Sequence, residues 1–196
     1  MTRWVIFTSA SEAAAGLRRA VVRLPGVRAC SVGPDLPGSF GGLGLSWDVT
    51  ADGGLSAVRS LLGGADADAV PLSPVASRTV DLPGPRVKRT LALTVRPGTP
   101  TETVARFEAD LTAMPDHIAT IRSWALSRVD TTVASSRWTH VWEQEFADVE
   151  GLTGEYLLHP YHWTYVDRWF DSELPSAVVA PALAHVFRWT DAPVLT

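Results

Sequence analysis

The chain has 196 residues, of which 46% are hydrophobic and 19% are charged, a composition typical of a globular protein and not of a disordered one. Its formal net charge of −4 supplies no basic surface for nucleic acid or anionic lipid. Cys30 is the only cysteine, which excludes an intrachain disulfide and a cysteine-based zinc site, and no run of about 18 apolar residues predicts a membrane span. We therefore expect a cytoplasmic protein without nucleic-acid or membrane partners.

The first half of the chain has a pattern of alternating strands and helices. Residues 4–8 are a β-like run, and the sequence Ser-Ala-Ser-Glu at 9–12 has the spacing of a helix capping box. An apolar stripe at helical spacing follows, and Pro25-Gly26 ends it. The remaining expected elements are strands at 27–32, 44–49 and 77–82, with a short helix at 55–62.

The second half repeats this order. A strand is expected at 91–95, and a capping-box sequence at 99–102 begins a helix whose apolar stripe extends to Met114. Proline ends this stripe as it ends the first one, here at Pro115. The other expected elements are a strand within 118–129, strands at 138–146 and 184–189, and a short helix at 149–158.

The order β-α-β-β-α-β in each half predicts an α+β fold made of two ferredoxin-like repeats. Because each repeat leaves one face of its sheet uncovered, the two sheets are expected to pack face to face as a dimeric α+β barrel within one chain. The alternative is that each half packs against a second copy of the chain in a homodimer. The expected boundaries are a degenerate repeat at 1–82, a linker at 83–86 and a second repeat, with the site, at 87–196.

The distribution of histidine points to the second repeat as the one with a functional site. Six of the eight tryptophans lie there, and so do all five histidines, which are His117, His140, His159, His162 and His185. A repeat rich in titratable side chains beside one without histidine indicates a single working site and a scaffold copy. A chance clustering of a rare residue is the alternative.

Two stretches of the second repeat carry the candidate site. Within 155–162, Pro160 disfavours helical geometry at His159, so the helix with Tyr156 is expected to break there and turn side chains towards a cavity. Alternate residues of the strand at 138–146 share one face, and a mixture of large aromatic and polar side chains is typical of a pocket lining. These residues are Trp138, His140, Trp142, Gln144 and Phe146.

The two stretches together resemble the stress-responsive dimeric α/β-barrel (Dabb) family. The resemblance covers about residues 87–190 and rests on Trp138-Thr139-His140-Val141, followed by Tyr156-Leu157-Leu158-His159-Pro160-Tyr161-His162. The family binds small molecules. Its enzymatic branch includes polyketide cyclases of the olivetolic acid cyclase type, which close a linear poly-β-ketone by intramolecular aldol condensation without a metal or an organic cofactor.

The resemblance implies a role for each matching residue. Tyr156 and His162 correspond to the catalytic pair, His140 to a supporting catalytic histidine, and His159 to a structural position, with no cofactor and no metal. The side chains expected to bind substrate are Arg89, Trp138, Trp142, Trp163 and Trp169. Two positions depart from the cyclases: Arg89 replaces a histidine on the first strand, and Arg188 replaces an aspartate that orients the catalytic histidine.

The expected function is therefore the cyclisation of a poly-β-ketone in aromatic polyketide biosynthesis, with a small apolar or aromatic molecule as the binding partner. His162 would serve as the base, and the Tyr156 hydroxyl would donate to the carbonyl that becomes an alkoxide. Three alternatives remain open: a cofactor-free aromatic monooxygenase, a metal site formed by His140, His159 and His162, and a non-enzymatic binding or stress-response protein.

Overall fold

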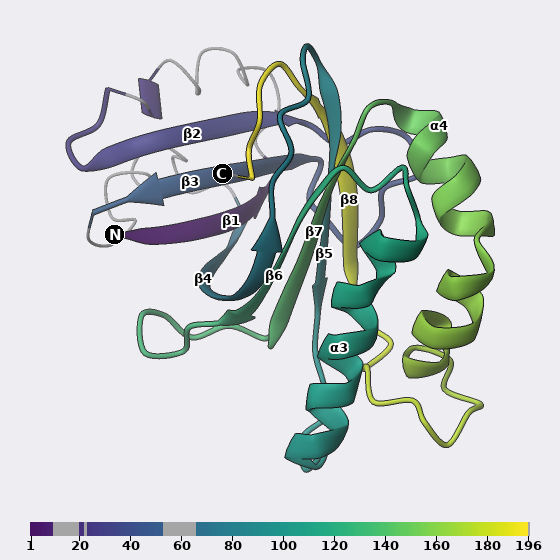
Figure 1. The fold of residues 1–196 in the computed structure, drawn as a ribbon. Helices are drawn as coiled ribbons and strands as arrows, with labels where there is room; N and C mark the ends of the chain where they lie inside the picture. Colours follow the sequence, from purple (N-terminus) through teal and green to yellow (C-terminus); the bar gives the residue numbers. More distant parts are fainter. Residues whose placement is uncertain (10–19, 22, 53–65, 196) are drawn as a thin grey trace.

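The computed structural model describes residues 1–9, 20–21, 23–52 and 66–195. In this part of the chain one antiparallel sheet of eight strands curves into an almost closed barrel, and helices cover the outer face of its second half (Figure 1). The strands are β1 (Thr2–Thr8), β2 (Val27–Pro34), β3 (Leu45–Ala51), β4 (Ala67–Arg78), β5 (Arg86–Leu93), β6 (Ser123–Val129), β7 (His140–Phe146) and β8 (Ala184–Thr190).

The strand order is β2-β3-β1-β4-β6-β7-β5-β8. The first half contributes β2-β3-β1-β4 and the second half β6-β7-β5-β8, so in each half the neighbouring strands follow the order second, third, first, fourth. This is the order of a ferredoxin-like sheet, so the predicted α+β class and ferredoxin-like arrangement are confirmed. Residues 10–19, 22 and 53–65, which include most of the two helices expected in the first half, lie outside the described residues.

The helices of the second half follow the predicted apolar stripes. Helix α3 (Thr101–His117) buries Phe107, Leu111 and Met114 against the sheet. Helix α4 (Val149–Gly151) continues into π-helical turns at Leu152–Tyr156 and His162–Val166 and a 3₁₀ turn at Asp167–Trp169. Together these segments and α3 form one layer over β5 to β8 (Figure 1).

Two strands differ from the prediction. β5 begins at Arg86, five residues before the expected start at 91, and ends at Leu93 and not at 95, because the charged residues Arg86, Lys88 and Arg89 obscure its buried pattern.

The last strand of the first half is β4 at Ala67–Arg78, and not 77–82. Proline is disfavoured in a central strand, and Pro71 and Pro74 interrupt the signal of β4 in the sequence. Each proline has one side without a regular ladder. Pro71 precedes the ladder with β6, which begins at Leu72, and Pro74 follows the ladder with β1, which ends at Leu72, and stands at the irregularity between Pro74 and Ala76.

Two seams join the halves into the barrel. The ladder between β4 and β6 forms one seam. At the other, the segment after β2 lies along β8, where Phe40 N donates to His185 O and Leu36 N donates to Phe187 O, each over 2.8 Å. Gly41 permits this approach, because its φ is 71° and a Cβ there would lie 1.8 Å from the carbonyl oxygen of Leu183.

Alternation along the strands separates three hydrophobic clusters. One lies on the first half, on the face opposite the barrel interior, and includes Trp4, Ile6 and Trp47. The outer core lies between β5–β8 and the helices and includes Leu91, Phe107 and Trp142. The inner core fills the barrel, and Val5 of the first half meets Val141 of the second there. Each strand of the second half therefore presents one set of side chains to the helices and the other set to the barrel interior.

A network of buried charges crosses the inner core. Asp48 accepts hydrogen bonds from Arg3 (2.7 Å), Lys88 (2.9 Å) and Arg188 (2.7 Å). Glu143 pairs with Lys88 at 2.7 Å and also with Arg3. Burial alone would raise the pKa of Asp48, but the three cations hold it well below the usual range. These pairs link β1 and β3 to β5, β7 and β8.

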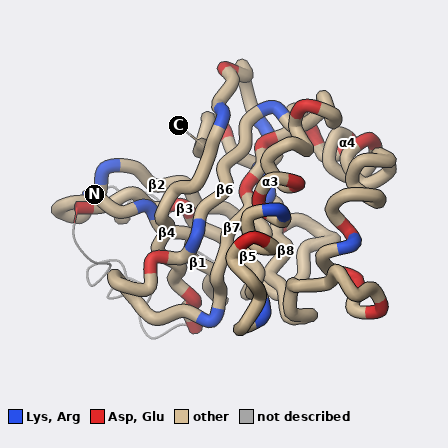
Figure 2. The backbone as a smooth tube through the Cα atoms, turned by 60° about the horizontal axis from the view of Figure 1, so that its bottom comes forward, with Lys and Arg blue, Asp and Glu red and all other residues tan. Residues whose placement is uncertain are grey.

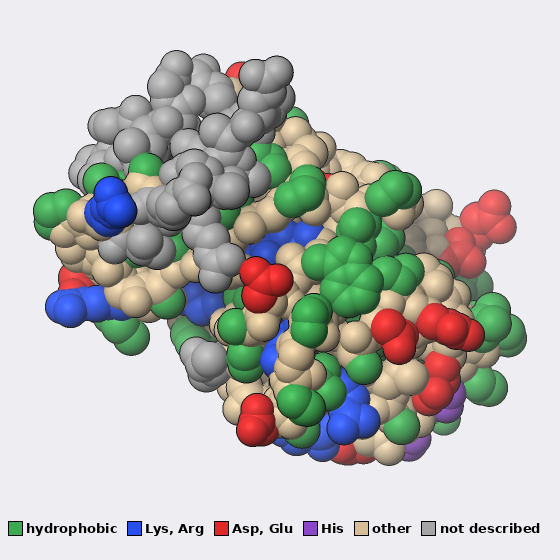
Figure 3. All heavy atoms as spheres, turned by 90° about the horizontal axis from the view of Figure 1, so that it is seen from above, with side chains coloured by type: hydrophobic (Ala, Val, Ile, Leu, Met, Phe, Trp, Pro, Cys, Tyr) green, Lys and Arg blue, Asp and Glu red, His purple; other side chains and the backbone are tan. Residues whose placement is uncertain are grey.

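Charges of both signs are distributed along the backbone (Figure 2). On the face seen from above, acidic and basic side chains are mixed with hydrophobic ones (Figure 3). Within the described ranges, no helix is long and apolar enough to cross a membrane.

We predict that Asp48→Asn lowers the free energy of unfolding by about 3 kcal/mol or more. Arg188 would lose its carboxylate partner, and Arg3 and Lys88 would be left with Glu143 alone. Since the pKa of Asp48 is lower in the folded than in the unfolded state, its stabilising contribution is present above about pH 4 and is lost as the pH falls. Urea unfolding from pH 7 to pH 3 measures both effects, and the acid-induced loss should be smaller in the variant.

The control is Asp52→Asn, in the exposed pair with Arg28, whose side chains are 43% and 65% exposed. Its effect should remain below about 1 kcal/mol. Equal effects of the two substitutions would contradict a stabilising role of the barrel network.

Candidate active site

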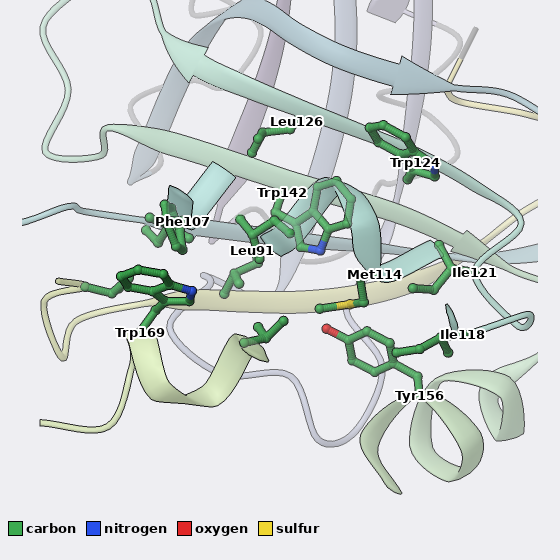
Figure 4. Close-up of a cluster of buried hydrophobic side chains, with 14 of the residues drawn as sticks. Leu91, Phe107, Met114, Ile118, Ile121, Trp124, Leu126, Trp142, Tyr156 and Trp169 are labelled. Carbon is green, nitrogen blue, oxygen red and sulfur yellow. The ribbon is translucent and has the colours of Figure 1, made fainter. Parts of the chain in front are cut away.

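A pocket of about 410 Å³ lies between the outer face of the second half and the helical segment at 152–170. Trp142 of β7 and Tyr156 of the helical segment reach into this layer from opposite sides (Figure 4). The pocket walls are mainly apolar, and its polar side chains are Arg89, Tyr156, His162, Asp167 and His185. A concave, mostly apolar cavity with a few convergent polar groups is typical of a small-molecule site.

The helical segment breaks where the sequence predicts. His159 lies outside the regular helix just before Pro160, and π-helical turns stand on both sides of the break. Asp110 of α3 holds the segment, since its Oδ2 accepts from Arg168 (2.7 Å) and from Trp169 Nε1 (2.8 Å). This anchoring places Tyr156 and the residues after the break on the same cavity.

Tyr156 and His162 lie in direct contact. Their rings pack edge to face with centroids 4.8 Å apart, although six positions along a regular helix would place them on different faces. Nδ1 of His162 lies 3.2 Å from Oδ1 of Asp167, within ion-pair distance but without the geometry of a hydrogen bond. Burial raises the pKa of Tyr156, against an opposing effect of Arg89, so its hydroxyl stays protonated at neutral pH.

Arg89 and His185 form a second polar pair in the pocket. Nε of Arg89 donates to Nε2 of His185 over 2.7 Å, and Nη1 donates to Oε1 of Gln144 over 2.6 Å. The guanidinium also lies over the ring of Tyr156, 5.1 Å from its centroid. Burial, with the charges of Arg89 and His162, lowers the pKa of His185 to about 3, so this histidine is neutral at physiological pH.

Ten of the fourteen residues that line the pocket were not anticipated as site residues from the sequence. Six of them are apolar side chains of the second half, and the other four are Gly38, Phe40, Asp167 and His185. Gly38 and Phe40 come from the glycine-rich loop at 37–44 of the first half, whose glycines do not have the spacing of a phosphate-binding loop. Asp167 is brought to His162 by the π-helical turn, and His185 could not be assigned to a face of its strand. The first half thus forms part of the pocket wall.

His140 does not reach the pocket, in contrast to the catalytic role expected for it. Its side chain faces the helices, as the alternation along the strand predicts. However, His140 is the first residue of β7, and the pocket does not extend to that end of the strand. There Nε2 lies 3.1 Å from Glu108 Oε1 and the ring contacts Phe107. Burial lowers the pKa of His140 even though Glu108 opposes this effect, and Arg128 satisfies the Glu108 charge at 2.7 Å. His140 therefore has the surroundings of a structural residue.

Of the four tryptophans expected to bind substrate, only Trp142 lines the pocket. Trp138 packs inside the barrel and donates to Asp68 over 2.8 Å, because the regular pairing of β7 begins two residues later. Trp163 is 54% exposed, and Trp169 is buried with its indole nitrogen on Asp110. The predicted common face therefore does not extend to Trp138.

Two further expectations concern Arg188 and His159. Arg188 faces the barrel interior and pairs with Asp48, so it does not occupy the place of an aspartate beside His162. Asp167 supplies a carboxylate there instead. His159 accepts a hydrogen bond from Tyr161 N over 3.1 Å at the helix break, which agrees with a structural position.

A second pocket, of about 390 Å³, opens at the barrel end next to Arg3 and Asp48. Arg3 pairs with both Asp48 and Glu143, so its charge is already compensated there. The described part of the chain contains no group of three or more His, Cys, Asp or Glu residues placed to hold a metal ion, so the alternative site of His140, His159 and His162 is not assembled. The pocket with Tyr156 is therefore the better candidate.

Comparison with known proteins finds a family match in the second half of the chain. Residues 87–180 match the model of the Stress responsive A/B Barrel Domain (Dabb), in agreement with the resemblance seen in the sequence. No curated protein sequence matches the chain.

Solved structures of similar length share the whole fold. An anthrone oxidase-like protein has a TM-score of 0.65 at 10% identity, over 97% of this chain and 92% of that one. A proposed monooxygenase from Lactobacillus acidophilus NCFM has a TM-score of 0.57 at 9% identity, over 97% and 95%. A proposed monooxygenase from Fusobacterium nucleatum has a TM-score of 0.57 at 8% identity, over 100% and 92%. At these identities the likeness shows the fold alone.

We predict that His140→Gln affects stability more than ligand binding or turnover. The substitution disturbs the buried hydrogen bond to Glu108, which should cost about 1–3 kcal/mol of unfolding free energy. Ligand affinity and turnover should change by less than about threefold, because the side chain does not line the pocket. Urea unfolding and an activity assay on the same preparation test both, and a large loss of turnover without loss of stability would restore a catalytic role.

Proposed function

We propose that this protein, which belongs through residues 87–180 to the stress-responsive A/B barrel (Dabb) family, is a cofactor-independent cyclase of a poly-β-ketone. The observation that carries the proposal is the contact of Tyr156 with His162 at the pocket, with Asp167 beside His162 Nδ1. We further infer that residues 1–82 are a degenerate copy of the second half, which completes the barrel and one wall of the pocket. The common strand order of the halves supports this.

The nearby Asp167 carboxylate would favour one of the two nitrogens of His162 as the base. A carboxylate 3.2 Å from Nδ1 favours the tautomer with the proton on Nδ1, which leaves the lone pair on Nε2. This nitrogen would accept a proton from the methylene group between two carbonyls of the substrate. Asp167 thus performs the orienting task for which the sequence alone offered no residue.

The remaining steps follow from the other residues of the pocket. The enolate carbon would attack a ketone carbonyl of the same chain, which forms a carbon–carbon bond and turns the carbonyl oxygen into an alkoxide. The Tyr156 hydroxyl, kept protonated by burial, would donate its proton to this oxygen and regain one from His162. Loss of water would then give the aromatic ring, and the apolar walls would hold the chain in a folded, near-attack shape.

We predict that His162→Ala lowers kcat by about 10²–10⁴-fold and Tyr156→Phe by about 10²–10³-fold, because they remove the base and the donor. Asp167→Asn should cost about tenfold, since its side chain is 51% exposed and its interaction with His162 is partly screened. Turnover of a synthetic linear poly-β-ketone, with the cyclic product detected by mass spectrometry, measures these effects.

Matched controls remove the same groups outside the pocket. His117→Ala and Tyr165→Phe alter exposed side chains and should leave kcat unchanged. If the pocket variants fold and retain full turnover, the proposed catalytic pair is wrong. Substrate that binds and is recovered unchanged from the wild-type protein would favour a binding protein instead.

A second candidate function is the cofactor-free oxidation of an aromatic substrate such as an anthrone. Two observations favour it: the fold shared with an anthrone oxidase-like protein, and the aromatic side chains of Phe40, Trp142 and Phe170 around the pocket. The first step would be the same, since removal of a proton from the anthrone methylene gives a carbanion that can react with O₂. One oxygen atom would then enter the quinone, and the other would leave as water.

We predict that this second function, if present, appears as oxygen uptake on addition of anthrone, with anthraquinone as the product. Trp142→Phe, in the pocket wall, should then reduce uptake by about tenfold. Trp163→Phe, whose ring is 54% exposed, should not change it. An uptake rate equal to that of the unfolded protein would exclude the oxidation.

A further inference from the structure

We infer that the ligand of this pocket carries a carboxylate group, which Arg89 and His185 bind. The inference rests on the proposed function for the pocket itself, and it specifies the class of substrate: a polyketide or aromatic acid, and not a neutral ketone.

Arg89 is a buried cation without a carboxylate partner among the described residues. Its side chain is only 4% exposed, and its hydrogen bonds run to two neutral groups, on His185 and Gln144. The one other charge-dependent contact is with the ring of Tyr156. Burial accordingly lowers the pKa of Arg89, since little in its surroundings compensates the charge.

The other buried cations differ from Arg89 in this respect. Lys88 and Arg188 both pair with Asp48, and Arg86 lies 3.8 Å from Glu145. A buried charge without a partner is costly, so a fold that neutralises three buried cations and leaves a fourth unpaired has a reason to keep it. Arg89 is also the one of the four that lines the pocket with Tyr156 and His162.

His185 provides a neutral donor beside this charge. Because Arg89 Nε–H donates to Nε2 of His185, the lone pair is on Nε2 and the ring proton is on Nδ1. Nδ1 is buried, and no other residue in the described part of the chain accepts a hydrogen bond from it. The ring is fixed by stacking on Phe40, with centroids 5.2 Å apart. The donor is therefore held ready for a ligand atom.

One positive charge with an adjacent neutral N–H suits a singly charged, planar anion. A carboxylate can accept from the guanidinium with one oxygen and from the imidazole with the other. A phosphate ester would bring close to two negative charges to a single cation. The apolar side chains of the pocket wall, among them Leu91 and Trp142, then accommodate the hydrocarbon or aromatic part of the acid.

The test compares 2,4-dihydroxybenzoate with 2,4-dihydroxybenzamide, which has nearly the same shape and no charge, by isothermal titration calorimetry at pH 7. The wild-type protein should bind the benzoate about tenfold more tightly or better. Arg89→Gln should reduce the preference to less than about twofold. The exposed Arg78→Gln, whose side chain is 45% exposed, should leave the preference unchanged.

Equal affinity for the two probes, or no binding of either, overturns the carboxylate site without the need for any variant. A preference that survives Arg89→Gln also overturns it. If Arg89→Gln does not fold, Arg89→Lys is the second variant, because it keeps the charge but loses the hydrogen bond to His185. Its affinity for the benzoate should fall, and its affinity for the benzamide should not. Failure of the cyclase is a separate result, namely full turnover by His162→Ala with the acid preference intact.

Discussion

The carboxylate of Asp48 holds the two halves of the barrel interior together. It accepts from Arg3 in its own half and from Lys88 and Arg188 in the other, so it is stable as an anion only when the strands that carry these cations keep their registers. Those registers also fix the opposite faces of β5 and β8, where Arg89 and His185 line the pocket. The internal charges and the geometry of the outer site thus depend on the same strand pairing.

The pocket combines groups with different mechanical support. Arg89 and His185 lie on strands in the middle and at the edge of a sheet, whereas Tyr156 and His162 lie on a broken helical segment held to α3 through Asp110. Rigid strands suit groups that recognise a ligand, and an interrupted helix suits groups that must adjust as a substrate changes shape. The loop of the first half closes the cavity with Phe40.

The sequence was sufficient for what depends on local pattern. Periodicity located α3 and six of the eight strands, and placed β5 five residues too late because its first residues are mostly charged. The resemblance to the Dabb family, carried by the motif around Pro160, paired Tyr156 with His162, and their rings lie in contact. Periodicity failed for β4, because two prolines hide a strand whose ladders are each incomplete. Asp167 could not be foreseen, since a π-helical turn changes which residues face each other, and the face of His185 depends on long-range pairing.

Along β5, β7 and β8, successive side chains point alternately to the charged barrel interior and to the pocket wall, which limits how this protein can evolve. Lys88 and Arg89 are adjacent in the chain but serve opposite faces, as do Glu143 and Gln144. A single substitution can therefore retune the ligand chemistry without touching the barrel. A one-residue insertion or deletion in these strands would exchange both sets at once. New specificities are accessible to this scaffold through replacements within the strands, and changes of length are left to its loops.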